Sequence, residues 1–374
     1  MHRLMPGVAI LEHELSELRL LVERQTGILL DCPNSALAAH VGEYLESAEL
    51  ESSAALMERL RASDQDPSIL PRFLDGVLNV NTGFYRHHGA MNALARCVIP
   101  QIYARKSDDG PATLRIWSAG CGTGEEPYSI AMAVTEAMNS GPAPNASTNK
   151  NGSTREKEGK EGKEKNSASR NGGIAESSAP LSATQLPKDW SIHIVGSDLL
   201  PSSIEVAERG LYPQSALVGL PPAIIRASFS KIGNATGGQN AAQYVTPENS
   251  QSPASEPIVG SNGSNSSSAN GNAAHLLVKP RLRSLVTFNT MNLTKPVYIG
   301  RFDCIFCMDV LPHLSRAQRT ALVERLHLYL EPGGYLFLSQ TEKLQAPNLN
   351  FRPETYDGYT FHRKPMAASA AYGR

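Results

Sequence analysis

The hydrophobic positions in the early part of the chain follow a helical period. Apolar residues recur every three or four positions at Leu11, Leu15, Leu18 and Val22, and Gly27 then ends the run. Further runs predict a helix capped by Ser35 and ending at about Ser47, another capped by Ser53 and reaching Leu60, a third near Ile69–Leu78, and one striped by Met91, Leu94, Val98 and Ile102. This pattern predicts an all-α N-terminal domain.

The pattern then changes to short apolar runs that alternate with helical ones, which is typical of a parallel α/β sheet. The runs that predict strands begin with Leu114–Trp117 and continue with Ser191–Asp198, Leu285–Asn289, Phe302–Cys307, Tyr335–Ser339 and an edge strand at Tyr359–Lys364. Helices are expected after Gly124, through Ile204–Ala207 and over Ala317–Leu330, the last stopped by Pro332. The sequence therefore predicts a Rossmann-like α/β domain.

Two stretches interrupt this rhythm, at about 139–187 and 233–274. Asn145–Lys165 and Ser261–Asn270 consist almost entirely of small polar and charged residues, which bury too little apolar surface to order themselves. We expect both to be disordered insertions without chemistry of their own. The predicted domains are residues 1–88 and 89–374, with a small β-subdomain at about 212–284 that resumes at Leu276–Lys279 after the second insertion.

Composition narrows the class of protein. The 374 residues are 41% hydrophobic and carry a formal net charge of -1, which argues against nucleic acid as the main partner. No run approaches the ~20 apolar residues of a membrane span. Glu12, Glu14 and Glu17 stand where a signal peptide needs an apolar core, so we expect a cytoplasmic protein without membrane insertion.

The cysteines and histidines do not predict a metal site. Cys304 and Cys307 have a metal-like spacing, but positions three apart on a strand point to opposite faces. Adjacent histidines such as His87 and His88 likewise diverge, and no acid cluster accompanies them. The cysteines are expected to be small core residues.

A glycine-rich turn follows the first predicted strand. Gly120, Gly122 and Gly124 are spaced G-x-G-x-G, and glycine lets the backbone approach a ligand closely. Glu125 and Glu126 follow where a pyrophosphate site would need positive charge, so the turn favours a cationic ligand. S-adenosylmethionine (SAM), with its sulfonium and ammonium groups, fits this pattern.

Two further segments are predicted to meet this turn at one sheet edge. Asp198 ends the second strand, where a carboxylate can accept hydrogen bonds from both ribose hydroxyls, although an acid before Pro201 can also cap a helix. Asn292 and Leu293 follow the third strand, where they are placed to meet an adenine ring.

These motifs occur together in an order that resembles the CheR-type chemotaxis receptor methyltransferases. The resemblance covers nearly the whole chain outside the two insertions. It rests on Asn81-Thr-Gly-Phe-Tyr-Arg86, Trp117-Ser-Ala-Gly-Cys-Gly-Thr-Gly-Glu-Glu-Pro-Tyr-Ser129, Asp198, Ala207-Glu-Arg-Gly-Leu-Tyr-Pro213, Asn292-Leu293, Phe302–Cys307 and Leu330-Glu-Pro-Gly-Gly-Tyr-Leu-Phe-Leu338.

The resemblance implies methyl transfer from SAM to glutamate side chains of chemoreceptors, leaving S-adenosylhomocysteine (SAH). It implies cofactor-binding residues Thr82, Arg86, Gly120, Gly122, Gly124, Glu126, Asp198, Asn292, Leu293 and Asp309, and catalytic residues Arg86 and His313. A glutamate is already ionised at neutral pH, so this chemistry needs no general base. The implied partner is a chemoreceptor-like protein substrate, and we expect the enzyme to be monomeric.

The chain also departs from the family pattern. Asp309 stands where the family has an asparagine that meets SAM, and His313 replaces a tyrosine near the transferred methyl group. Between Asp31 and Ser47 there is no lysine or arginine, although family members that dock acidic receptor helices present arginines there. Two alternatives therefore stay open: a regulatory SAM- or SAH-binding protein with weakened catalysis, and a methyltransferase for another acceptor.

Overall fold

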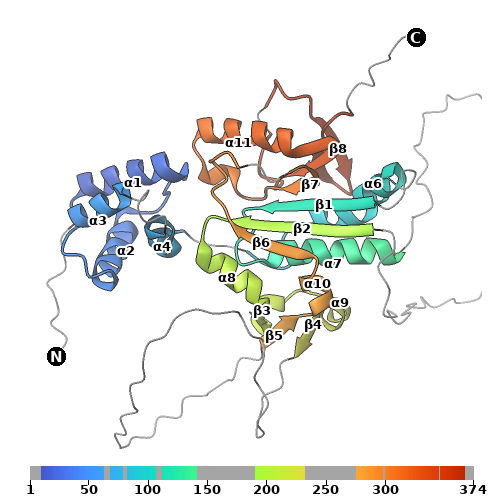
Figure 1. Ribbon diagram of the computed structural model, residues 1–374, viewed down its shortest axis with the longest axis horizontal. Coiled ribbons are helices and arrows are strands. Elements are labelled where there is room, and N and C mark those ends of the chain that lie inside the picture. The colour runs from blue at the N-terminus through green and yellow to red at the C-terminus, as the bar shows by residue number, and fades with distance from the viewer. Residues whose placement is uncertain are drawn as a thin grey trace, which may run out of the picture.

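The computed structural model (Figure 1) describes residues 10–62, 68–78, 82–106, 112–140, 190–231, 275–297, 300–344 and 346–366. The predicted disordered segments Asn145–Lys165 and Ser261–Asn270 lie outside them, as does Asn81.

Four helices form the N-terminal part: α1 (Glu12–Thr26), α2 (Asn34–Ser47), α3 (Ser53–Arg61) and α4 (Ile69–Val77). Their apolar stripes pack into a core that includes Leu18, Val41 and Phe73, and Leu200, just before α8, also belongs to it. The two predicted caps are wrong by one or two residues. α2 begins after Pro33, and α3 is capped by Ser52, whose hydroxyl accepts a hydrogen bond from the Ala55 amide at 3.2 Å. In both cases another residue that suits a helix start stands just before the predicted cap.

Within the described ranges, the main sheet has seven strands in the order β6-β2-β1-β7-β8-β10-β9. Parallel pairing joins β1 (Ala112–Ala119), β2 (Trp190–Asp198), β6 (Val286–Thr290), β7 (Phe302–Phe306) and β8 (Leu330–Phe337). From β1 the chain builds outward on one side through β2 and β6 and on the other through β7 and β8. The strand order therefore reverses between β1 and β7, and ligands of such sheets bind at the carboxyl ends beside this reversal. The α/β prediction is confirmed.

The prediction of an edge strand at Tyr359–Lys364 is wrong. β10 (Tyr359–Arg363) lies between β8 and β9 (Arg352–Tyr356), pairing antiparallel with both, so β9 is the edge. β9 was not predicted. Its residues, Arg-Pro-Glu-Thr-Tyr, are polar and mostly exposed, because an edge strand buries little side-chain surface.

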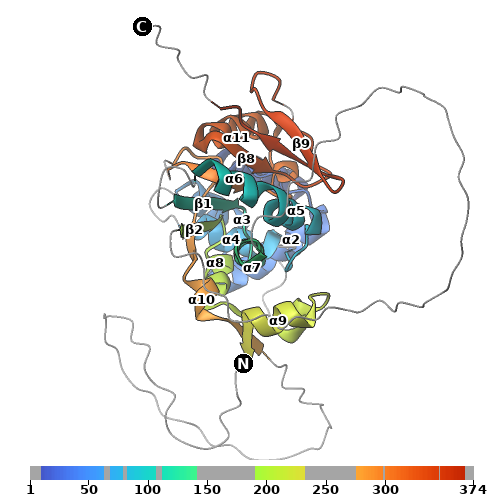
Figure 2. The same ribbon diagram turned by 90° about the vertical axis from the view of Figure 1, so that its right-hand side faces the viewer.

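Helices cover both faces of the sheet (Figures 1 and 2). On one face α7 (Glu125–Ser140) packs with a continuous helical run, α5 (His88–Ala93), a π-helical turn at Leu94–Val98 and α6 (Ile99–Lys106). α11 (Arg316–Tyr329) covers the other face. Cys304 belongs to the first core and Cys307 to the second, which confirms that the two thiols diverge.

A small antiparallel sheet follows α8 (Pro201–Arg209), with β3 (Leu211–Pro213), β5 (His275–Val278) and β4 (Phe229–Lys231) in that order. The resumption predicted at Leu276–Lys279 corresponds to β5. The helices α9 (Pro222–Ser228) and α10 (Pro280–Arg283) flank the strands.

The N-terminal helices lie against the carboxyl edge of the main sheet, towards which β1 and β2 point (Figure 1). The Leu29 amide donates to the carbonyl of His313 at 2.8 Å, and the Thr294 hydroxyl donates to the carbonyl of Thr26 at 2.8 Å. Ser202 at the start of α8 donates to Asp75 of α4 at 2.5 Å. The edge where parallel sheets bind ligands is therefore bordered by both parts of the chain.

Candidate functional site

The glycine turn, Gly120–Gly124, connects β1 to α7 in a conformation that requires glycine. Gly120, Gly122 and Gly124 all have positive φ, at 84°, 53° and 95°. A Cβ on Gly120 would lie 2.5 Å from the Val310 side chain, and one on Gly124 would lie 2.6 Å from that of Ala207. The backbone of this turn thus passes between the loop after β7 and α8 with no room for a side chain.

Asp198 ties the end of β2 to this turn. One carboxylate oxygen accepts a hydrogen bond from the Gly122 amide at 2.9 Å, and the other accepts from the Leu200 amide at 3.0 Å. Burial raises the pKa of Asp198, while these backbone hydrogen bonds favour its ionised form. The Leu199 amide also hydrogen-bonds to Asp198, and because a carboxylate offers about four acceptor positions, part of its acceptor capacity stays open for a ligand.

Glu126 lies in the first turn of α7 and is partly buried. Its carboxylate accepts a hydrogen bond from the Ser118 hydroxyl of β1 at 2.7 Å. Burial, with a smaller contribution from the nearby carboxylates of Asp309 and Glu342, raises its pKa to about 7, against the opposing effects of the Ser118 hydrogen bond and of Arg86. A cationic ligand beside this carboxylate would lower its pKa again and so stabilise the ionised form.

The adjacent Glu125 contacts the linker, residues 82–87, which leads from the N-terminal helices into α5. It is buried, and hydrogen bonds from the Thr123 hydroxyl at 2.7 Å and from Thr82 oppose the rise in pKa that burial causes. The sequence analysis placed Thr82 with the cofactor-binding residues; here it pairs with Glu125.

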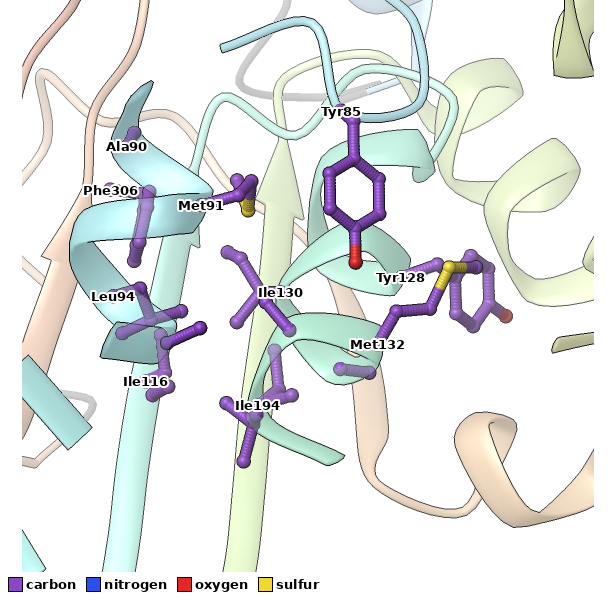
Figure 3. Close-up of a cluster of buried hydrophobic side chains, with 14 of the residues drawn as sticks. Tyr85, Ala90, Met91, Leu94, Ile116, Tyr128, Ile130, Met132, Ile194 and Phe306 are labelled. Carbon is purple, nitrogen blue, oxygen red and sulfur yellow. The ribbon is translucent and has the colours of Figure 1, made fainter. Parts of the chain in front are cut away.

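Tyr85 fixes the end of the same linker. Its φ is 52°, which few non-glycine residues adopt, and its amide donates to the Ser129 hydroxyl at 2.9 Å. Figure 3 shows the ring inserted among buried side chains and extending towards Met132 of α7. Burial accordingly raises the pKa of the Tyr85 hydroxyl. Because Tyr85 points into the core, the next residue, Arg86, is turned towards the sheet edge.

Arg86 meets the 307–314 loop, which follows β7. Its guanidinium lies 3.3 Å from the Asp309 carboxylate, and the His87 imidazole lies 2.9 Å from the same carboxylate oxygen. Asp309 itself has φ 57°. The site thus brings the linker residues Arg86 and His87 onto a carboxylate more than two hundred residues away in the sequence.

Glu342 supports this loop and was missed by the sequence analysis. Its carboxylate accepts from the amides of Asp309 at 3.2 Å, Leu311 at 3.0 Å and Ser339 at 2.8 Å. Burial raises its pKa against the effect of these hydrogen bonds. The signal that could have found it is an acid just beyond the carboxyl end of the fifth predicted strand, at the edge where the other candidates lie.

Asn292 and His313 lie away from the Arg86–Asp309 pair. The Asn292 side-chain oxygen accepts from the Thr294 amide at 2.9 Å, and its amide faces the carbonyl of Gln25 at 3.5 Å, so its contacts are with its own turn and with α1. Leu293 is partly buried against the core under α11. His313 is exposed, and its contact with the N-terminal helices runs through its backbone carbonyl. Neither Asn292 nor His313 touches the Arg86–Asp309 pair.

The remaining candidates show no metal-binding chemistry. Within the described ranges, no group of three or more histidine, cysteine or acidic side chains is placed to hold a metal ion. Burial raises the pKa of the Cys121, Cys304 and Cys307 thiols well above the ordinary value, which makes these thiols inert.

None of the helices in the described part of the chain combines the length and apolar character needed for a membrane span.

The chain is similar to known methyltransferases. The family model "CheR methyltransferase, SAM binding domain" matches residues 80–145 and 262–359. A chemotaxis protein methyltransferase of Pseudomonas aeruginosa is 24% identical over 87% of this chain and 88% of its own length. The chemotaxis protein methyltransferase of Borreliella burgdorferi is 22% identical over 94% of this chain and 95% of its own length.

The solved structure of magnesium protoporphyrin IX methyltransferase from Synechocystis with bound SAH shares 11% sequence identity with this chain. The match covers 80% of this chain and 97% of the solved one, with a TM-score of 0.27. The family model, which matches less than half of the chain, and the relatives, which span most of it at 22–24% identity, together support a divergent member of the CheR methyltransferase family.

Proposed function

We propose that this protein transfers the methyl group of SAM to the oxygen of glutamate side chains on chemoreceptor-like signalling proteins. The observation that carries the proposal is the convergence of the glycine turn, Asp198 and Glu126 at one end of β1 and β2, with Arg86 brought to the same edge by the linker. The family membership and the names of the relatives support the same reaction.

The residues at this edge fit SAM. The glycine turn leaves a close backbone approach that a Cβ would fill, Asp198 keeps acceptor positions for ribose hydroxyls, and Glu126 offers a carboxylate to an ammonium group. When bound, SAM supplies an electrophilic methyl group on a sulfonium. We assign Gly120, Gly122, Gly124, Glu126 and Asp198 to its binding. Asn292, Leu293 and Thr82 stay predictions, because their contacts described above do not include the turn.

Arg86 is the residue proposed to receive the acceptor carboxylate. A guanidinium can hold a carboxylate through two parallel hydrogen bonds, which would align one oxygen for attack. The acceptor needs no general base, since a glutamate is ionised at neutral pH. His313 as a second catalytic residue stays a prediction: its side chain is exposed, and the groups that contact Asp309 are Arg86 and His87.

Several finer statements are proposals as well. They are a chemoreceptor as the specific partner, a monomeric state, a cytoplasmic location, and the division of the chain into residues 1–88 and 89–374. The packing of α1–α4 around a core to which the α/β part contributes Leu199 and Leu200 supports that division.

The experiment that tests the function is incubation of the purified protein with methyl-labelled SAM and a membrane fraction of its own host. Carboxyl methyl esters are released by mild base, so base-labile label on membrane proteins is the expected result. A matched reaction with the Asp198→Ala variant should lose the label. Stable label would assign a different acceptor.

A second candidate is a regulatory protein that binds SAM or SAH without efficient turnover. The observation that favours it is the ion pair between Arg86 and Asp309, which engages the proposed acceptor-binding group. Measurable SAH binding by calorimetry, combined with no transfer to any host fraction, would select this candidate.

A further inference from the structure

The negatively charged Asp309 contacts two basic side chains. A neutral asparagine in its place could not form ion pairs with them. One of its oxygens lies 3.3 Å from the Arg86 guanidinium and 2.9 Å from the His87 imidazole. Charge-assisted hydrogen bonds of this kind are stronger than neutral ones. Arg86 and Asp309 remain 38% and 32% exposed, so a ligand arriving from solvent can reach the same guanidinium.

The backbone holds this carboxylate in place. Asp309 has φ 57°, and Glu342 accepts hydrogen bonds from the amides of Asp309 and Leu311 on either side of the bend. The same Glu342 is anchored to the segment just after β8 (Leu330–Phe337) through the Ser339 amide. The position of Asp309 is therefore set by the sheet as well as by its attraction to Arg86.

The electrostatics around Arg86 are dominated by acids. Asp309 and Glu342 both act to raise the pKa of Glu126, and Arg86 acts to lower it, so these four groups share one local field. An incoming carboxylate meets like charge from Asp309, and from Glu126 and Glu342 to the extent that these two buried acids are ionised. Among the four, Arg86 alone offers it attraction.

We propose that Asp309 is a specificity-determining residue that competes with the acceptor carboxylate for Arg86. An acceptor glutamate has to displace Asp309 from the guanidinium, and it approaches against the charge of Asp309 while doing so. The residue thereby weakens the affinity for carboxylate acceptors and leaves cofactor binding to the glycine turn and Asp198. The inference rests on the proposed function, in which Arg86 receives the acceptor.

The main test compares the wild type with Asp309→Asn. Asparagine adopts positive φ readily and keeps the size of the side chain, so the bend is preserved while the competing charge is removed. Steady-state methylation of a soluble cytoplasmic fragment of a host chemoreceptor, at saturating SAM, gives the acceptor KM. We expect this KM to fall about tenfold.

Asp357→Asn is the matched control. Asp357 also has positive φ, at 48°, and is exposed in the turn between β9 and β10. Its substitution removes the same charge from the same backbone conformation without touching Arg86, so its acceptor KM should equal that of the wild type. Asp309→Gly, which also tolerates positive φ, provides a second variant if the asparagine variant unfolds.

A second readout does not depend on methyl transfer. The SAH-bound protein, labelled at arginine side chains, is titrated with sodium glutarate at constant ionic strength, and the Arg86 Nε–H resonance is followed by NMR, assigned with Arg86→Lys. Glutarate should shift this resonance in Asp309→Asn at concentrations that leave the wild type and Asp357→Asn unchanged.

The outcomes separate the inference from the proposed function. A lower KM together with the variant-specific NMR shift supports both. If none of the three proteins transfers a methyl group but the NMR shift is still specific to Asp309→Asn, glutamate methylation is refuted. The competition between Asp309 and a carboxylate for Arg86 then still holds. An unchanged or higher KM together with an identical glutarate response in all three proteins would overturn the inference.

Discussion

The glycine turn and the 307–314 loop lie at the same sheet edge but are held in different ways. The turn is fixed by its own glycines and by Asp198 on the adjacent parallel strand. The loop is fixed by Glu342 from beyond β8 and faces Arg86 from the linker. The first region depends on a local motif, whereas the second depends on three segments far apart in the sequence. A protein can therefore keep its glycine turn while the loop diverges, and here two of the departures from the family pattern, Asp309 and His313, fall in the loop.

The largest effect is expected from a substitution that disrupts the glycine turn. Gly124 and Gly219 both have φ 95°, but a Cβ on Gly124 would lie 2.6 Å from the Ala207 side chain and 3.0 Å from its backbone, whereas one on Gly219 would meet nothing within 4 Å. Gly219→Ala should cost about 1–2 kcal/mol of unfolding free energy through strain alone. Gly124→Ala should add roughly 1–3 kcal/mol from overpacking. It should also lose detectable SAH binding.

Urea unfolding of both variants and SAH calorimetry check this comparison. Equal stability losses in the two variants would show that the turn is not closely packed against α8.

A smaller effect is expected where the turn meets the ligand. Asp198→Ala removes the proposed ribose acceptor and leaves the Gly122 amide without its partner. SAH binding should weaken by about 1–3 kcal/mol, which is roughly five- to 150-fold. The matched control is Glu205→Ala, an exposed acid on α8. Calorimetry in which both variants bind SAH as tightly as the wild type would remove Asp198 from the site.

The third prediction uses pH to test Glu126. Its pKa of about 7 lies above the ordinary value, so in the ligand-free protein the protonated form dominates below pH 7. A ligand ammonium pairs with the ionised form, and SAH affinity should therefore rise about five- to tenfold between pH 6 and pH 7.5. Glu126→Gln should flatten this rise.

The stability of the ligand-free protein should change with pH in the opposite direction to its SAH affinity. Since the folded-state pKa is raised, ionising Glu126 costs the ligand-free protein stability as pH climbs from the ordinary carboxyl range through about 7. Urea unfolding across this range should show that loss in the wild type and a smaller one in Glu126→Gln. An affinity for SAH that falls with pH in the wild type would contradict the role of Glu126.

The smallest expected effect concerns the N-terminal helices. Because α2 carries no lysine or arginine, binding of an acidic receptor-type helix should depend little on salt. A shallow groove between α2 and α4 does contain Arg72, but Glu43 and Asp75 also line it. Steep weakening of binding between low and physiological salt would contradict this expectation.

The best variant to introduce a basic face is Glu43→Arg, since Glu43 is exposed. His40, on the same helix, is less suitable. Its imidazole contacts the Phe73 carbonyl at 2.8 Å and lies where a Cβ on Gly76 would be. Glu43→Arg should strengthen binding of an acidic helix and introduce salt dependence, with Glu23→Arg on α1 as the control.

The sequence by itself determined the class of the fold and the cofactor side of the candidate site. Periodicity distinguishes helices from strands, and a G-x-G-x-G turn after a buried strand constrains its own backbone because only glycine suits those φ values. The parallel register places Asp198 beside Gly122 once β1 and β2 are neighbours. These relations are short-range or follow from sheet geometry.

Only the tertiary structure decided the acceptor side and the sheet edge. No local pattern shows that Asp309 meets Arg86, that Glu342 supports Asp309, or that Asn292 turns towards α1. The insertion of β10 between β8 and β9 was equally hidden, because an exposed edge strand has no hydrophobic alternation to reveal it. Contacts between distant segments depend on how the whole chain packs, and packing leaves no periodic signal in the residues that meet.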